Sequence, residues 1–186
     1  MLKKIVKEYF LRNKLFYFFY KYKKIYKNKG KGIYFGDYAE DIIVNRFFKN
    51  LKKGFYCDIG CFHPSKGSLT YLLYKKSWSG MNIDLSKTSI DLFDIARKND
   101  INLNAGISNY NVLLGINFKN IRPKMICIED NKFSFILMNK SKIYNYLKKK
   151  SYFLFSVCGV SQIYIDNKFK NLLSKILDTR HSINYF

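Results

Sequence analysis

Short apolar segments and amphipathic segments alternate between residues 37 and 107, and this alternation limits the folds that are open to the chain. The apolar segments have the length of buried strands, and the segments between them have the spacing of amphipathic helices. The sequence predicts strands over 55–59, 80–84 and 101–107, and helices over 37–51, 68–76 and 88–97. Strands and helices that alternate in this way form a parallel α/β sheet with right-handed crossovers.

The second part of the chain has a different pattern. It predicts a strand over 123–130, a basic helix over 141–150, and two strands within 152–165 that meet near Gly159. Two neighbouring strands that meet at a glycine are typical of a β-hairpin. We therefore expect the parallel sheet to continue into a C-terminal antiparallel hairpin.

The N-terminal segment is rich in lysine and aromatic residues, and a basic linker with glycines follows it at 27–32. We expect residues 1–32 to form a helix and linker, and residues 33–186 to form one domain. The helix has two possible roles: it packs its aromatic side chains on the domain, or residues 1–28 lie on an anionic membrane surface. In the second role Phe16, Phe18 and Phe19 sink below the headgroups, inside a ring made of Lys14, Lys21, Lys23 and Lys24.

The chain is strongly basic, with 34 Lys and Arg residues against 13 Asp and Glu residues and a formal net charge of +21. Such a balance often accompanies nucleic acid or anionic lipid as a partner. Arginine, which binds phosphate with two parallel hydrogen bonds, occurs only at positions 12, 46, 97, 122 and 180. No basic stripe accompanies a known nucleic-acid motif, so specific nucleic-acid recognition is not expected.

Cysteine usage and hydropathy point to a cytoplasmic protein. The four cysteines lie at 57, 61, 127 and 158, and with two histidines in the chain they make a poor zinc site, so no metal is expected. Three of them lie in predicted strands, which favours buried reduced thiols. No segment has the roughly 20 apolar residues of a membrane span. We expect a cytoplasmic location, peripheral at the inner face of the membrane if the N-terminal helix binds lipid.

The stretch "GFYCDIGCFHP" at 54–64 carries an acid to the end of a predicted strand. Asp58 and Gly60 lie at this strand end, and Asp84 ends the next strand, 24 residues after Gly60. In α/β sheets ligands bind beyond the carboxyl ends of the strands, and an acid at this spacing accepts hydrogen bonds from ribose hydroxyls. A lone glycine fits a nucleoside without phosphates, such as S-adenosylmethionine, better than a dinucleotide. The alternative is that both acids cap turns or helices.

Several blocks of the sequence resemble the FkbM-type family of S-adenosylmethionine-dependent methyltransferases. These blocks are "GFYCDIGCFHP", "LTYLLYKKSWSGMNID", "DINLNAGIS" and "IRPKMICIED". The resemblance implies a Rossmann-like methyltransferase fold with seven strands, and methyl transfer to a hydroxyl of a glycan or glycosylated metabolite. It implies that Asp58 and Gly60 form the methionine side of the cofactor site and that Asp84 holds the ribose.

The same resemblance places His63 and Ser68 on the loop above the transferred methyl group. His63 would then be the proton acceptor, or catalytic residue, for the acceptor hydroxyl. The alternative is that His63 only caps the loop before Pro64.

A central strand of that fold has no place in the sequence. Only the 16 residues 108–123 separate Ile107 from Lys124, whereas a helix, a strand and a second helix need roughly 35 to 40 residues. We expect 124–128 to take the lost place beside 55–59 in one sheet. The deletion also favours an alternative function: a non-catalytic, methyltransferase-derived binding module attached to a membrane surface or a protein partner.

Overall fold

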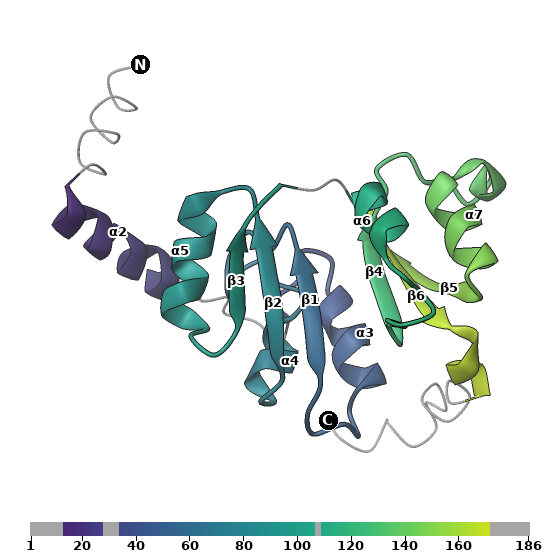
Figure 1. Cartoon of the computed structure of the whole chain (residues 1–186), viewed down its shortest axis with the longest axis horizontal. Coiled ribbons are helices and arrows are strands. Elements are labelled where there is room, and N and C mark those ends of the chain that lie inside the picture. The colour runs from purple at the N-terminus through teal and green to yellow at the C-terminus, as the bar shows by residue number, and fades with distance from the viewer. Residues whose placement is uncertain (1–12, 28–33, 107–108, 172–186) are drawn as a thin grey trace. The chain divides into compact units, whose positions relative to one another are not determined.

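The computed structural model describes residues 13–27, 34–106 and 109–171. The chain separates into two compact units, the first ending at Gly106 and the second beginning at Ile107. Figure 1 shows both units with their elements labelled. Each unit has a sheet of its own, so the two are described in turn.

The first unit contains the predicted parallel sheet. Its strands are β1 (Phe55–Ile59), β2 (Ser79–Asp84) and β3 (Ile101–Asn104), in the order β1-β2-β3. All neighbours are parallel, and the register places Asp58 beside Asn82 and Asp84 beside Asn104. The carboxyl ends of β1 and β2 therefore meet at one edge of the sheet, as the sequence predicted.

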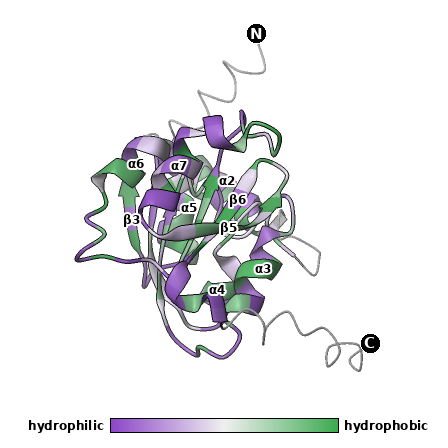
Figure 2. Ribbon diagram, turned by 90° about the vertical axis from the view of Figure 1, so that its right-hand side faces the viewer, coloured by the Kyte–Doolittle hydropathy of each residue, from purple (hydrophilic) through white to green (hydrophobic). Residues whose placement is uncertain are grey.

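The described part of this unit contains the helices α2 (Lys14–Lys27), α3 (Glu40–Phe47), α4 (Tyr71–Lys75) and α5 (Lys87–Ala96). The predicted alternation of helices and strands is confirmed. Helices α3 and α4 are shorter than their predicted ranges, and α5 has its predicted length but begins one residue earlier. Helix α5 packs on β2 and β3, and α2 packs on α5. The ribbon of α3 carries both hydrophobic and hydrophilic residues (Figure 2), as expected of an amphipathic helix with one buried side.

The second unit is an antiparallel sheet with short helices. Its elements are α6 (Asn109–Gly115), β4 (Met125–Glu129), η1 (Met138–Lys140), α7 (Lys142–Lys149), β5 (Tyr152–Cys158), β6 (Ser161–Asp166) and η2 (Asn167–Phe169). Strand β6 lies between β4 and β5 and is antiparallel to both. The predicted hairpin is therefore confirmed, and the strand predicted at 123–130 joins it.

The expected pairing of 55–59 with 124–128 is not among the strand ladders of the described residues. In those ladders β1 pairs with β2, and β4 pairs with β6. The described strands therefore make two three-stranded sheets where one continuous sheet was expected. The sequence reasoning gave β4 a parallel neighbour because its continuous apolar run suits burial on both faces. An apolar strand of this kind pairs equally well with an antiparallel neighbour, which here is β6.

The second unit has its own apolar core, built from α6, α7 and the sheet. The buried residues of this core are Leu113, Phe118, Ile128, Ile143, Leu147, Tyr152 and Tyr164. An ion pair closes one end of it: Arg122 Nε donates to Asp166 Oδ2 over 2.6 Å, and an Nη of Arg122 donates to Asp166 Oδ1 over 3.1 Å. Burial alone raises the pKa of Asp166, but its hydrogen bonds from Arg122 and from the Lys168 amide outweigh burial and lower it.

In the part of the chain that the structure describes, no helix is both long and apolar enough to cross a membrane.

We predict that Asp166→Asn destabilises the second unit by about 3 kcal/mol, because it removes one partner of a buried ion pair. Native-state hydrogen exchange of the β6 amides measures this loss where it occurs. Asp94→Asn is the control, because Asp94 is an exposed carboxylate and such a change costs within about 0.5 kcal/mol. Unchanged protection of β6 in Asp166→Asn would contradict the prediction.

Candidate functional site

The backbone at the end of β1 turns sharply at Gly60. This residue has φ +77°, and a Cβ placed on it would meet no atom within 4 Å. Its amide donates to the Ile83 carbonyl oxygen over 2.8 Å, which holds the turn against the end of β2. Gly60 therefore lies at an open position where a ligand can approach the backbone.

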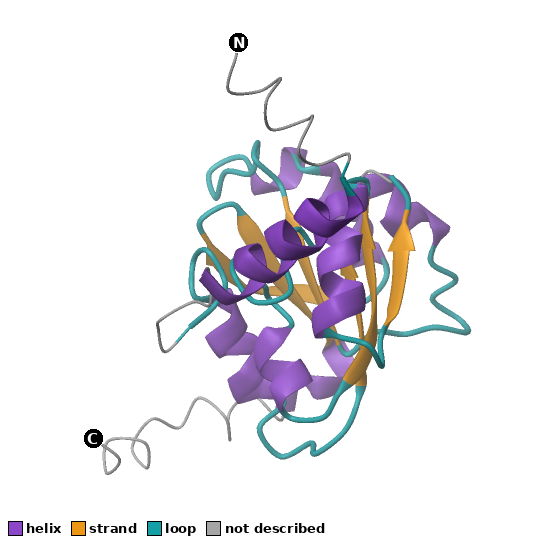
Figure 3. Ribbon diagram, turned by 90° about the vertical axis from the view of Figure 1, so that its left-hand side faces the viewer, coloured by secondary structure: helices purple, strands orange, loops and turns teal. Residues whose placement is uncertain are grey.

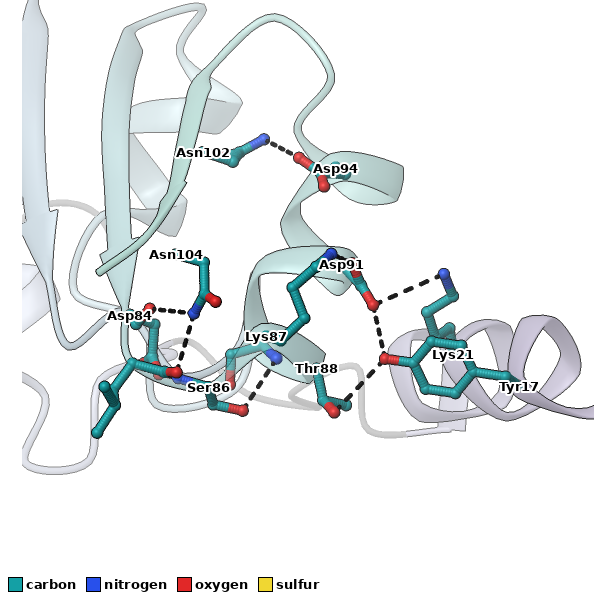
Figure 4. A network of polar contacts seen from close by, with 12 residues as sticks. Tyr17, Lys21, Asp84, Ser86, Lys87, Thr88, Asp91, Asp94, Asn102 and Asn104 are labelled. Carbon is teal, nitrogen blue, oxygen red and sulfur yellow. Dashed lines mark hydrogen bonds and ion pairs between the residues drawn. The ribbon is translucent and has the colours of Figure 1, made fainter. Parts of the chain in front are cut away.

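The carboxylate of Asp84 joins the two strand ends. Its Oδ2 accepts from the Phe62 amide over 2.9 Å, and its Oδ1 accepts from the Ser86 amide over 2.7 Å. The Asn104 side chain, at the end of β3, donates to the backbone oxygens of Asp84 and Leu85 (Figure 4). A carboxylate oxygen accepts two hydrogen bonds, so Asp84 keeps acceptor capacity for a ligand.

Asp58 lies on β1 and faces a polar interior. Its Oδ2 accepts from the Thr70 hydroxyl over 2.7 Å. Burial raises the pKa of Asp58, and the nearby charge of Asp84 raises it further, while the Thr70 hydrogen bond and the charge of Arg97 oppose the rise. Asp58 is thus held by the protein at the strand end, half-buried beneath the turn at Gly60.

Thr70 connects Asp58 to a fully buried arginine. The side chain of Arg97 is 0% exposed, and all five of its N–H groups have acceptors. Nε donates to the Pro64 carbonyl, one Nη donates to Tyr56 and Thr70, and the other donates to Pro64 and Ser68. Within the described residues no carboxylate pairs with Arg97 directly, so the counter-charge of Asp58 reaches it through the Thr70 hydroxyl.

Aromatic rings enclose the Arg97 guanidinium. The distances from Cζ to the ring centroids are 4.9 Å for Phe93, 5.1 Å for Tyr74, and 5.8 Å for both Tyr56 and Tyr71. A cation near aromatic faces is attracted by the ring quadrupoles, and the attraction is stronger where water is absent. The rings thus offset part of the cost of burying this charge.

The Tyr56 hydroxyl connects Arg97 to a second carboxylate, that of Asp100. It accepts from Arg97 and donates to Asp100 Oδ2, and the same carboxylate accepts from the Gly80 amide over 2.9 Å. Gly80 is required here, because a Cβ would lie 2.2 Å from the Tyr56 ring. The glycine lets the tyrosine cross β2 and connect Arg97 to Asp100.

Ser68, predicted to lie above the transferred methyl group, is buried in this network. It is 1% exposed, and its hydroxyl accepts from Arg97 over 2.8 Å. The structure therefore brings Ser68 close to Asp58 through the shared neighbours Thr70 and Arg97. Its hydroxyl positions the loop and does not face an open site.

His63 is also buried, at 1% exposure, and both ring nitrogens have partners. Nδ1 accepts from the amides of Ser65 and Lys66, each over 3.1 Å, and Nε2 lies 3.3 Å from the Lys24 carbonyl oxygen. Since Nδ1 is an acceptor, Nε2 carries the proton and donates a hydrogen bond to the Lys24 carbonyl oxygen. This geometry favours the loop-capping alternative for His63 over the role of proton acceptor.

The two cysteines near the end of β1 differ in exposure: Cys57 is exposed, whereas Cys61 is buried. The three cysteines in strands, predicted to be buried, are exposed or only partly buried. Cys61 is 3% exposed, and burial followed by the charges of Asp58 and Asp84 raises the pKa of its thiol, so it stays protonated at neutral pH. Across residues 13–27, 34–106 and 109–171, no three His, Cys, Asp or Glu side chains are arranged to hold a metal ion.

Sequence reasoning did not identify Arg97, Thr70, Tyr56 or Asp100 as parts of this site. The available signal was the rarity of arginine, since most of the basic residues in this chain are lysines. The arginine side chain has five N–H donors in a fixed planar arrangement. An arginine in a chain rich in lysine is therefore a candidate for a position where these donors are needed.

We predict that Arg97→Lys lowers the free energy of unfolding of the first unit by about 3 kcal/mol, since an ammonium cannot fill all five donor positions. Urea unfolding followed by fluorescence measures this directly, because the only tryptophan, Trp78, is buried in this unit. Arg46→Lys, on the exposed side of α3, is the matched control. Equal midpoints for the two variants would show that the guanidinium network is not stabilising.

We predict that His63 makes the first unit less stable as the pH falls below about 6.5. Burial lowers the pKa of His63 from 6.5, so the unfolded chain binds a proton more readily than the folded one. The stability that depends on a neutral His63 is fully present above the pKa that His63 has in the unfolded chain. It is lost as the pH falls from there to the lower pKa of His63 in the folded chain. Trp78-detected unfolding at pH 7.5 and 5.5 tests this with His63→Gln, which should be less stable than the parent but show a flatter pH dependence. The same pH dependence in both proteins would contradict it.

Comparison with known proteins adds no outside evidence to this geometry. No family model, no curated protein and no solved structure matches the chain.

Proposed function

We propose that the first unit binds S-adenosylmethionine at the carboxyl ends of β1 and β2, and that the chain is a methyltransferase of FkbM type. Its acceptor would be a hydroxyl on a glycan or a glycosylated metabolite. The observation that carries the proposal is the pairing of Gly60, which has open space above it, with Asp84, whose carboxylate retains acceptor capacity. Both belong to the edge where α/β sheets bind ligands.

The backbone amides of the turn favour a cofactor without phosphates. A phosphate site needs free N–H groups, but the amides of Gly60 and Cys61 donate to the Ile83 oxygen, and the Phe62 amide donates to Asp84. The carboxylates of Asp58 and Asp84 would also repel a phosphate. The same carboxylates attract the positive charge of a sulfonium.

Each residue of the site has a separate task in this proposal. Asp84 accepts from the two ribose hydroxyls, and Gly60 lets the methionine part of the cofactor approach the backbone. Asp58, held by Thr70, adds negative potential beneath the turn. S-adenosylmethionine, when bound, supplies a methyl group on a positively charged sulfur. The protein then contributes mainly the alignment of an acceptor hydroxyl with that methyl group.

The strand order also supports a methyltransferase ancestry. A parallel β3-β2-β1 group and a group that ends in an antiparallel hairpin are what a seven-stranded methyltransferase sheet would leave if its central strand were removed. Residues 105–124 connect β3 with β4 and contain the segment 108–123, where the sequence led us to expect the deletion.

A second candidate is a binding module that no longer transfers a methyl group. The observation that favours it is the state of His63, whose Nδ1 lone pair is already shared by two backbone amides. His63 therefore cannot take the proton of an acceptor hydroxyl without releasing its own loop. The two candidates share the cofactor site and differ only in turnover.

We predict that the full chain binds S-adenosylmethionine with a dissociation constant of roughly 100 µM, weak because one wall of the usual site is missing. Asp84→Asn should weaken binding at least about tenfold, because a charge-assisted hydrogen bond contributes about 1.5–3 kcal/mol. Isothermal titration calorimetry measures both, with Asp94→Asn as the control. Trp78 fluorescence confirms that each variant is folded.

The outcomes separate the two candidates. Binding together with formation of S-adenosylhomocysteine in the presence of glycan acceptors supports the enzyme, and binding without turnover supports the module. No heat of binding in the folded chain, or equal affinity in Asp84→Asn, would contradict both.

A further inference from the structure

Helix α2 has two faces with different roles. One face is formed by Tyr17, Lys21, Lys24 and Ile25, at the spacing of successive helical turns. The Tyr17 hydroxyl donates to Asp91 Oδ2 over 2.6 Å, Lys21 Nζ lies 4.0 Å from the same carboxylate, and Ile25 is 7% exposed. Figure 3 shows α2 lying across α5, and Figure 4 shows the contacts of Tyr17 and Lys21 with Asp91. This inner face fixes the helix on the first unit.

The backbone of α2 is held as well. The Lys24 carbonyl accepts from His63 Nε2, so the loop after β1 also restrains the helix. Hydrogen bonds of Asp91 from Tyr17 and Lys87 outweigh the effect of burial and lower the pKa of Asp91, which keeps it ionised at neutral pH. The orientation of α2 on the first unit is therefore defined at two places.

The outer face of α2 carries a stripe of large apolar side chains: Leu15, Phe19, Tyr22 and Tyr26. Their spacing of four, three and four residues places them on one line along the helix. Leu15, Phe19 and Tyr26 are 68%, 62% and 60% exposed. Phe18 stacks beside the stripe, with its ring centroid 4.6 Å from that of Tyr22, and the rings of Tyr22 and Tyr26 are 6.0 Å apart. We call Leu15, Phe19, Tyr22 and Tyr26 the outer stripe.

The charged side chains of α2 are all lysines. Lys14 and Lys23 are exposed beside the outer stripe, and α2 contains no Asp or Glu. Lysine is depleted from the interfaces between proteins, whereas lysines that flank aromatic and aliphatic side chains suit an anionic lipid surface. A 14-residue helix is about 21 Å long, so it would lie along a bilayer surface and not cross it.

We propose that the outer stripe of α2 docks the protein on an anionic phospholipid bilayer. The apolar side chains enter the boundary between headgroups and acyl chains, while Lys14 and Lys23 contact lipid phosphates and carboxylates. The inner face keeps its contacts with α5, so docking needs no unfolding of the first unit. The proposal rests on α2 alone and is independent of cofactor binding.

Sedimentation with vesicles tests the proposal on the full chain. Vesicles of phosphatidylcholine with about 30% phosphatidylserine represent an anionic surface, and pure phosphatidylcholine represents a neutral one. The key variant is Leu15→Ser with Phe19→Ser and Tyr26→Ser, which leaves every charge in place. It should lower the partition coefficient on anionic vesicles by about tenfold or more, because the buried apolar area is lost. The matched control is Phe135→Ser with Ile136→Ser, two exposed apolar side chains of the second unit.

A charge variant completes the test. Lys14→Gln with Lys23→Gln should lower binding by roughly tenfold or more, whereas Lys52→Gln with Lys53→Gln, exposed lysines before β1, should change it less. Trp78 fluorescence checks that all variants are folded. Equal sedimentation of the triple variant and the parent would overturn the proposal, since general basicity would then explain binding. Equal binding to neutral vesicles, no binding to either kind, or self-association through the stripe without vesicle binding would also overturn it.

Discussion

The buried guanidinium of Arg97 is the interaction on which the candidate site depends. A charge removed from water is costly, and it is tolerated only when every donor is satisfied and a counter-charge is near. Here the five N–H groups reach Tyr56 on β1, the Pro64 carbonyl and Ser68 in the loop after it, and Thr70 before α4. Because these acceptors lie on separate segments, satisfying one arginine fixes the path of the chain around the end of β1.

The positions of the two site carboxylates follow from that arrangement. Thr70 holds Asp58 because its hydroxyl is itself oriented by Arg97. Asp84 then ties the loop to β2 through the Phe62 amide. The loop continues to His63, whose neutral ring joins it to α2. One polar network thus connects the strand ends, the loop and the N-terminal helix, and it leaves Gly60 open.

The sequence predicts the regular parts of this structure well, because they follow from periodicity. The parallel order of β1, β2 and β3 and the hairpin of β5 and β6 come from short apolar runs separated by helices or by a glycine turn. Gly60 and Asp84 are found at adjacent strand ends for the same reason. The pairing of β4 was not predictable, since an apolar strand does not specify which neighbour it takes.

The sequence does not predict the polar network around Arg97, because its residues are of types that are common at helix ends and in loops. Arg97 is the last residue of a predicted helix, where an exposed basic residue is common, and Ser68 and His63 resemble loop residues available to a ligand. Only tertiary packing shows that the three are buried together. A loop histidine or serine therefore gives a weak prediction of catalysis until the partners of its polar atoms are known.

Binding of S-adenosylmethionine over the turn at Gly60 is the part of the proposed function from which the rest follows. The most direct measurement is a nuclear magnetic resonance titration of the isotope-labelled full chain with S-adenosylhomocysteine, read from the backbone amides. We expect the largest shifts on the amides of Gly60, Cys61, Phe62 and Ser86, and no shifts on the amides of β4, β5 and β6. Shifts confined to the second unit, or no shifts in the segment from Gly60 to Phe62, would contradict this expectation.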